Sequence, residues 1–574
     1  MRGSRSTSLW CAIWCATVMA GLGVCSAAAA AGHRPTMSQA VAAMHAGKWK
    51  RAAGLLEQIT ADEPRNAGAW RALGNADLHM KRFTPAVIAL EKALRFEPDS
   101  PQTLFRMGEA YAGLHATDKA LGWLERARET GRFDMTELAE DPVLGKLRSD
   151  PRLVKLLPVP ADFEPPFVEP VKVIREWRGE ASGDQFGWIA RQIGDVDGDG
   201  VPDIVTSAPT HGAHGSNSGR IYVYSVGTGK LQWAADGDRE DQLGSGLEGA
   251  GDTNGDGIPD VVASGPGGTG VVRIYSGRDG RVLQTLRPHR SDEVFGNHVS
   301  GAGDLDGDGS TDVIVGAPGK PDASGNPGNA YVYSGRDGSV LQTLTGERDG
   351  DAFGSAVSGY SDLRHFLVVG APAAGATRHG RIYVYRERST RPVFTFDADE
   401  TGRALGEMFV SVVGDADGDG VSDLYGSDWM NESRGPSTGR VYVYSGRTGE
   451  RLLALTGESA GDGFGTSPSM AGDVDGDGRA DLIVGAWQYG KVAVGAGKAY
   501  LYSGRDAQLL ATFSCRIPGD AFGFDAVGIG DVDHDGTADL LITSGWSGVN
   551  GHHSGRVFVI SSGISSRALE RRSD

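Results

Sequence analysis

Residues 194–203 read Gly-Asp-Val-Asp-Gly-Asp-Gly-Val-Pro-Asp, and similar stretches recur through the rest of the chain. The seven repeating units are marked by Asp195, Asp252, Asp304, Asp362, Asp415, Asp473 and Asp531, at spacings of 57, 52, 58, 53, 58 and 58 residues. A regular period of this length indicates an array of structural repeats. The 87 glycines among 574 residues predict many tight turns and therefore many short strands.

Each unit is expected to supply about four short strands. Aromatic and β-branched residues alternate about 20 residues after the aspartates, which is typical of half-buried strands: Ile221–Tyr224, Tyr331–Tyr333, Ile382–Tyr385, Val441–Tyr444 and Tyr500–Tyr502. Radial packing of seven such units predicts an all-β, seven-bladed propeller. The last unit ends after Val557–Ile560, so we expect Val171–Trp177 to supply the strand that completes its blade.

Six of the seven units contain the pattern D-x-[DN]-x-D-G-x-x-D, whose side chains and one carbonyl offer oxygen ligands of the kind that calcium prefers. The predicted ligands, at positions 1, 3, 5, 7 (by its carbonyl) and 9, are Asp195, Asp197, Asp199, Val201, Asp203; Asp252, Asn254, Asp256, Ile258, Asp260; Asp304, Asp306, Asp308, Ser310, Asp312; Asp415, Asp417, Asp419, Val421, Asp423; Asp473, Asp475, Asp477, Arg479, Asp481; and Asp531, Asp533, Asp535, Thr537, Asp539. An EF-hand is rejected because Thr206 stands at position 12 and strands flank the loop.

The pattern predicts about six calcium ions. They would offset 12 of the 18 net negative charges of the chain. The fourth unit, at Ser361–Phe366, has lost the ligands, so no ion is expected there. With Cys515 as the one cysteine outside the N-terminal segment, bound calcium would take the place of disulfides in stabilising the fold.

The repeats resemble the FG-GAP repeat of the integrin α-chain propeller. The Phe-Gly element is present as Phe186-Gly187, Phe295-Gly296, Phe353-Gly354, Phe464-Gly465 and Phe522-Gly523, and the Gly-Ala-Pro element as Gly316–Pro318 and Gly370–Pro372. The resemblance implies a role in adhesion or surface recognition.

The N-terminal part contains a different repeat, with a period of 34 residues. Alanines at 52, 86 and 120 and leucines at 56, 90 and 124 mark three units, with apolar residues at helical spacing within them. Trp70–Gly74 and Gly108–Tyr111 resemble the signature of the tetratricopeptide repeat family, whose members usually bind a peptide or partner protein in a groove. A scaffold packed on its neighbour is the alternative.

These patterns divide the chain into five segments. Arg2 and Arg5, the apolar run Leu9–Val24 and the small residues after it are typical of a secretory signal peptide, residues 1–32. An uncleaved membrane anchor is the alternative. We expect helical repeats at 33–140, a proline-rich linker at 141–170, the propeller at 171–563 and a polar tail at 564–574. The protein is accordingly expected to be secreted, extracellular or periplasmic.

The sequence favours a non-catalytic recognition module for a protein or glycan. The negative net charge argues against nucleic acid. Two G-x-S-x-G stretches, at 435–439 and 457–461, lack the strand and helix that a hydrolase elbow requires. The open alternatives are a carbohydrate-active propeller, either a lectin or a polysaccharide lyase, and a quinoprotein-like enzyme. Trp429, Trp487 and Trp546 occupy long loops expected on one rim, where they would suit sugar stacking or a protein contact.

Overall fold

The computed structural model describes the chain except for residues 1–33, 269, 321–324, 361–365, 468–469 and 566–574. The expected signal peptide, the altered loop of the fourth unit and most of the polar tail therefore lie outside the described residues. The chain divides into two compact units, residues 1–164 and 165–574. Each unit has its own hydrophobic core.

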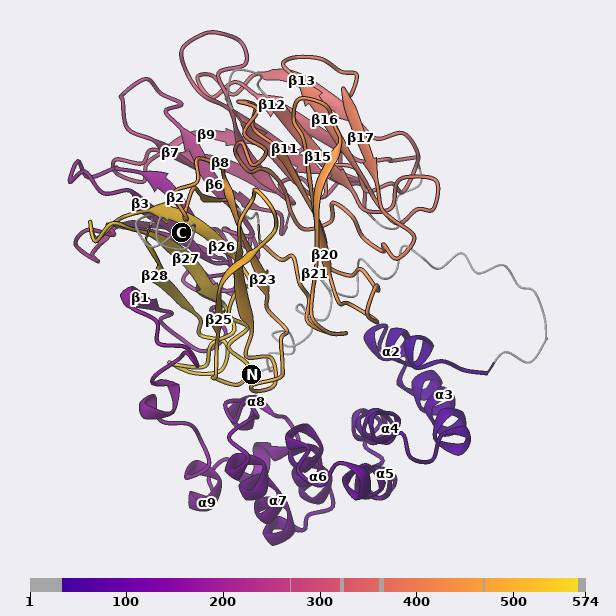
Figure 1. The fold of residues 1–574 in the computed structure, drawn as a ribbon. Coiled ribbons are helices and arrows are strands. Elements are labelled where there is room, and N and C mark those ends of the chain that lie inside the picture. The colour runs from indigo at the N-terminus through magenta and orange to yellow at the C-terminus, as the bar shows by residue number, and fades with distance from the viewer. Residues whose placement is uncertain (1–33, 269, 321–324, 361–365, 468–469, 566–574) are drawn as a thin grey trace, which may run out of the picture. The chain divides into compact units, whose positions relative to one another are not determined.

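The smaller unit consists of helical hairpins (Figure 1). Its six longer helices form consecutive pairs: α2 (Met37–His45) and α3 (Trp49–Asp62), α4 (Ala67–His79) and α5 (Phe83–Phe96), α6 (Pro101–Gly113) and α7 (Thr117–Glu129). Paired helices approach closely, because a Cβ at Gly74 would clash with Leu90 and one at Gly108 would clash with Leu124. The repeated small residues thus have a packing role, and the helical repeat expected from the sequence is confirmed.

The helical unit continues into the segment that was expected to be a linker. Short helices follow at α8 (Glu137–Glu140), η2 (Leu144–Leu147), α9 (Pro151–Val154) and η3 (Pro160–Phe163). Leu144 and Leu153 are buried in the core of this unit. Pro151 and Pro160 each begin a helix, where the missing N–H group leaves no hydrogen bond unmade. Residues 144–153 are therefore packed against the helical repeats.

The larger unit has seven four-stranded antiparallel sheets, so the predicted seven-bladed propeller is confirmed. From the innermost strand outward the first four blades are β2 (Ala190–Gly194), β3 (Asp203–Ala208), β4 (Arg220–Tyr224), β5 (Leu231–Asp236); β6 (Gly246–Gly251), β7 (Asp260–Gly265), β8 (Val271–Tyr275), β9 (Val282–Leu286); β10 (Val299–Gly303), β11 (Asp312–Ala317), β12 (Asn329–Tyr333), β13 (Val340–Thr345); and β14 (Val357–Tyr360), β15 (Phe366–Ala371), β16 (Arg381–Arg386), β17 (Phe394–Asp397).

The last three blades complete the ring. They are β18 (Val410–Val412), β19 (Leu424–Asp428), β20 (Arg440–Tyr444), β21 (Arg451–Thr456); β22 (Met470–Gly472), β23 (Asp481–Ala486), β24 (Lys498–Tyr502), β25 (Leu509–Ser514); and β26 (Ala526–Gly530), β27 (Thr537–Ser544), β28 (Arg556–Ser565), β1 (Val173–Arg178). Strand β1 pairs with β28 from Val173↔Ile560 to Arg178↔Arg556. The expected closure of the last blade by the first strand is confirmed.

The Phe-Gly and Gly-Ala elements lie where neighbouring blades meet. Phe186 is fully buried, and its backbone N–H donates to the carbonyl oxygen of Ser554, in the seventh unit, at 3.1 Å. A Cβ at Gly485 would clash with the carbonyl oxygen of Gly523, which belongs to the Phe-Gly element of the next unit. Glycine is thus required because two backbones touch.

Candidate metal centres

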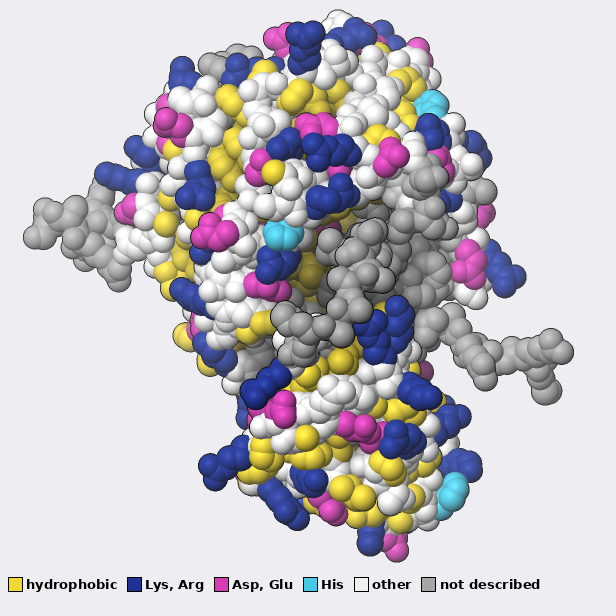
Figure 2. All heavy atoms as spheres, turned by 90° about the vertical axis from the view of Figure 1, so that its right-hand side faces the viewer, with side chains coloured by type: hydrophobic (Ala, Val, Ile, Leu, Met, Phe, Trp, Pro, Cys, Tyr) yellow, Lys and Arg dark blue, Asp and Glu magenta, His cyan; other side chains and the backbone are white. Residues whose placement is uncertain are grey.

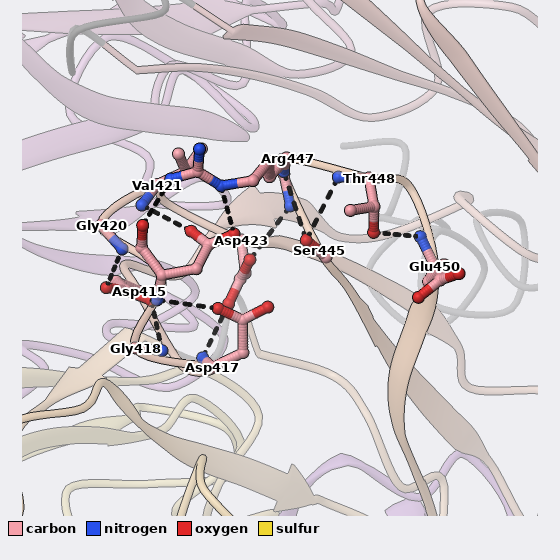
Figure 3. Close-up of polar contacts among 12 residues, drawn as sticks. Asp415, Asp417, Gly418, Gly420, Val421, Asp423, Ser445, Arg447, Thr448 and Glu450 are labelled. Atoms are coloured by element: carbon pink, nitrogen blue, oxygen red, sulfur yellow. Dashed lines mark hydrogen bonds and ion pairs between the residues drawn. The ribbon is translucent and has the colours of Figure 1, made fainter.

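Each acidic loop connects the innermost strand of a blade to its second strand. In the loop between β18 and β19, Asp415 accepts hydrogen bonds from the backbone N–H groups of Gly418 at 2.6 Å and Gly420 at 2.7 Å (Figure 3). Asp419 accepts one from the N–H of Val421 at 2.8 Å. Gly418 has a φ of +79°, which allows the chain to turn around the Asp415 carboxylate. The side chains at positions 1 and 5 are thereby fixed by the backbone of their own loop.

The aspartate at position 9 joins the loop to the blade. Asp423 is fully buried and accepts hydrogen bonds from the N–H groups of Ala416 at 2.9 Å and Gly446 at 3.0 Å. Burial raises the pKa of Asp423 to about 6. The N–H of Asp417 also donates to Oδ2, at 3.2 Å, whereas Oδ1 accepts the one bond from Gly446 and keeps a lone pair that a cation could use.

The same arrangement recurs around the ring. Every position-9 aspartate is fully buried, and each accepts a hydrogen bond from the second residue of its loop. Burial raises the pKa to about 6 for Asp203, Asp312, Asp423, Asp481 and Asp539. The pKa of Asp260 is also raised by burial. Neutralisation by a proton or a cation is therefore favourable at each loop.

The predicted ligands converge. Three carboxylates of a loop have oxygens within 4.8 Å of one another in the groups Asp195, Asp197, Asp199; Asp304, Asp306, Asp308; Asp415, Asp417, Asp423; and Asp473, Asp475, Asp481. In the second loop Asn254 instead donates from its amide nitrogen to both oxygens of Asp260. Oxygen donors in this number and of this charge suit a hard divalent cation. The position-7 residues Val201, Ile258, Ser310, Val421, Arg479 and Thr537 each directly follow the glycine of the loop.

Arginines contact the loops from outside, which the sequence analysis did not anticipate. Arg447 donates from Nε to Asp419 Oδ2 at 2.7 Å, and Arg336 donates to the carbonyl oxygen of Asp308 at 2.7 Å. Arg278 Nε lies 3.5 Å from Asp256 Oδ2. All three arginines occupy the recurring Ser-Gly-Arg turn after the third strand, which was the signal available in the sequence. They hold the position-5 carboxylate without entering the loop.

The three predicted ligand-binding tryptophans each follow the second strand of a blade. Trp487 and Trp546 stack with ring centroids 5.0 Å apart, and both contact Phe524. Trp188 extends this aromatic cluster through Trp546, at 5.5 Å. Trp429 has a different setting, because its indole N–H donates to the buried carboxyl of Glu407 at 2.9 Å. The structure thus brings two of the three tryptophans together.

The innermost strands surround a cavity of about 230 Å³. Arg191, on β2, lines it and is almost fully buried. Its guanidinium forms ion pairs with Glu248 at 2.8 Å and with Asp525. This cluster joins the first, second and seventh blades and was not predicted from the sequence.

On the face shown in Figure 2, acidic and basic side chains are interspersed.

The two G-x-S-x-G stretches lie in loops of the propeller. Residues 457–461 directly follow β21, and residues 435–439 directly precede β20. Neither stretch stands between a strand and a helix.

Among the residues that the structure describes, each helix is too short or too polar to cross a bilayer.

The fold and the loops place the larger unit in the class of repeat β-propellers with acidic loops. The same chain also contains helical hairpins. Its repeats match the FG-GAP repeat model at residues 192–224, 464–502 and 524–560, and the FG-GAP-like repeat model at 252–315. A tetratricopeptide repeat model matches residues 43–102. The chain thus contains FG-GAP repeats in its propeller and a tetratricopeptide repeat in its helical part.

Similar curated proteins are integrin alpha chains. Integrin alpha-4 of Xenopus laevis is 30% identical over 253 residues, covering 40% of this chain and 23% of the integrin. Integrin alpha-PS3 of Drosophila melanogaster is 33% identical over 159 residues, covering 25% of this chain and 14% of the integrin. The chain thus spans less than a quarter of the length of these relatives. Among solved structures, BBS1N in complex with ARL6DN is similar over 69% of this chain and 98% of that chain, with 11% identity and a TM-score of 0.43.

Proposed function

We propose that this chain is a secreted or surface-exposed calcium-binding propeller that acts as a non-catalytic adhesion or recognition module for a protein or a glycan. The observation that carries the proposal is the repetition of one loop structure around the ring, with acidic oxygens held by the loop backbone. A chance acidic turn would not place positions 1 and 9 in the same hydrogen bonds in six blades. Similarity to integrin alpha chains supports the recognition role.

Calcium is the proposed ion because every expected ligand is an oxygen atom. Carboxylates at positions 1, 3, 5 and 9 with the carbonyl of position 7 would supply most of a six- to eight-oxygen shell. About six ions are proposed, one for each loop that keeps the pattern. At affinities of roughly 10⁻⁴ to 10⁻³ M, each ion would stabilise the fold by about 1 kcal/mol at millimolar calcium.

The aromatic cluster of Trp487, Trp546, Phe524 and Trp188 is the proposed contact region for the ligand. Trp487 and Trp546 are partly exposed, so their rings offer apolar area beside the polar loops of the rim. Aromatic rings of this kind stack on sugar faces and serve as anchors in protein interfaces. The tetratricopeptide-like hairpins are proposed as a second arm that binds a peptide or protein.

The first test is calorimetric titration of chelator-stripped protein with calcium, followed by thermal unfolding. We expect several sites and a clear rise in the unfolding temperature of the propeller. Asp304→Asn, which alters the first ligand of one loop, should remove one site and leave the others. Absence of binding, or binding without stabilisation, would contradict the proposal.

The second test screens the calcium-loaded protein against glycan and matrix-protein arrays. Trp487→Ala should weaken binding to any ligand found, whereas Trp233→Ala, a substitution inside a blade, serves as the control for general destabilisation. Equal loss in both variants would argue that the aromatic cluster is structural.

A further inference from the structure

The acidic loop of the seventh unit, residues 531–539 and here called the seventh loop, differs in its backbone from the other five acidic loops. Position 4 has a φ between +76° and +81° in the other five loops, and glycine occupies it in each: Gly198, Gly255, Gly307, Gly418 and Gly476. In the seventh loop His534 occupies this position with a φ of +60°. A residue with a side chain is strained in the left-handed region. The backbone conformation of this loop therefore costs more free energy than that of the other five.

The buried aspartate of this loop also has fewer contacts. In the other five loops, position 9 accepts a hydrogen bond from a backbone N–H in the turn after the third strand, at 3.0 to 3.3 Å. Asp539 Oδ1 has no hydrogen-bond partner among the described residues. Strand β27 begins at Thr537, which is position 7 of its loop. In the other blades with an acidic loop, the second strand begins at position 9 or later.

A cation from the protein itself contacts the seventh loop. Lys172 Nζ lies 2.6 Å from Asp533 Oδ2 and 2.6 Å from Asp535 Oδ2. These carboxylates are the predicted metal ligands at positions 3 and 5. Arg447, by contrast, contacts only position 5 of its loop. The ammonium group of Lys172 thus bridges two ligands, as a bound metal ion would.

Lys172 also connects this loop to the closure of the ring. It directly precedes β1, and its carbonyl oxygen accepts a hydrogen bond from the N–H of Ser561 on β28 at 3.0 Å. The cation that neutralises the loop is therefore attached to the strand that completes the blade. A divalent ion could not share positions 3 and 5 with the ammonium group, because like charges repel and the same oxygens are needed.

We propose that Lys172 is an internal cation that occupies the seventh loop, so that metal binding at this loop competes with the contact that anchors the start of β1. The inference rests on the proposed function, since it assumes that the other loops bind a divalent cation. The seventh loop is then the weak site of the ring. High metal concentration would expel Lys172 and loosen the start of β1.

The test is calcium titration of the full chain with site-resolved fitting, using the wild-type protein, Lys172→Met and Lys172→Arg. The wild-type protein should have one site about tenfold weaker than the rest. Lys172→Met should tighten that site about tenfold, and Lys172→Arg should leave it weak because the positive charge remains. Adding Asp531→Asn to Lys172→Met should abolish the tightened site, which assigns it to this loop.

Two controls separate the alternatives. Lys119→Met removes an equal charge from the helical unit and should change no calcium site. His534→Gly relieves the backbone strain, and if it tightened the weak site while Lys172→Met did not, the inference would be overturned. Calcium binding unchanged in Lys172→Met would also overturn it. If no variant bound calcium at any loop, the proposed function itself would fail.

Hydrogen exchange provides a readout independent of affinity. In the wild-type protein, saturating calcium should speed amide exchange in residues 173–178 severalfold relative to limiting calcium. Lys172→Met should show the same exchange at both concentrations. Protection of these amides that increases with calcium in the wild-type protein would contradict displacement of Lys172.

Discussion

Glu407 is an acidic residue whose role is set by burial rather than by a metal ligand pattern. Its side chain is 6% exposed, and its carboxyl group accepts a hydrogen bond from the indole N–H of Trp429. Burial, together with the nearby carboxylate of Asp428, raises the pKa of Glu407 to about 7. The carboxyl group is consequently shared between protonated and ionised forms near neutral pH.

Substitution of Glu407 should change how stability depends on pH. A carboxyl group whose pKa is higher in the folded state binds more protons when folded, so stability falls as the pH rises from about 4.5 to 7. The effect is at most about 3 kcal/mol. Glu407→Gln mimics the protonated form and should be more stable than wild type at pH 7.5, with the difference vanishing near pH 4.5.

Thermal unfolding of both proteins between pH 4.5 and 7.5 checks this expectation. Burial lowers the pKa of His298 to about 4, which acts in the opposite direction, so the difference between the two proteins is the informative quantity. A constant difference across this range would show that Glu407 does not titrate there.

Among the elements, β1 decides whether the seventh blade is complete. Trp177 on this strand is 7% exposed, its ring lies 5.3 Å from that of Tyr224, and its indole N–H donates to the carbonyl oxygen of Gly229 at 3.0 Å. These partners belong to the first blade. The strand therefore pairs with the seventh blade and packs against the first.

Truncation of Trp177 should weaken the packing of β1 against the first blade. Trp177→Ala is expected to destabilise the propeller by about 3–5 kcal/mol through lost burial and the cavity left behind. Hydrogen exchange should increase first in β1 and β28. Val173→Ala, on the same strand but 38% exposed, should change stability by less than about 0.5 kcal/mol. Equal effects of the two substitutions would show that packing of Trp177 does not hold the blade.

The sequence predicted the elements better than the contacts between distant elements. Alternation in Ile221–Tyr224 and the aspartate spacing are local patterns, and both the blades and the acidic loops follow from them. Strand β1 was predictable because the last unit lacked a strand. The ion pairs of Lys172 with Asp533 and of Arg191 with Asp525 were not, since ring closure brings these residues together from distant parts of the sequence.

The prediction for the linker shows a second limit of the sequence. A short helical stretch was expected before the prolines of this segment, but the local pattern did not predict that Leu144 and Leu153 pack into the helical core. Prolines at the first position of a helix do not interrupt it. Which of the two effects prevails depends on apolar neighbours that the local pattern does not identify.

At the scale of the whole molecule, the acidic loops all belong to the larger of the two compact units. Differential scanning calorimetry of the full chain should therefore show two transitions. Chelation should lower the temperature of the propeller transition and leave that of the helical unit unchanged, because only the propeller would lose bound ions. Equal shifts of both transitions would show that the two units unfold as one.

Closure of the ring by β1 has a consequence for synthesis. Val173 pairs with Ile560, which is translated 387 residues later. At about 5–20 residues per second, the first strand waits roughly 20–80 s for its partner. Throughout that time its edge is free to pair with other chains. The edge of this strand is therefore exposed to such pairing until the last blade has been synthesised.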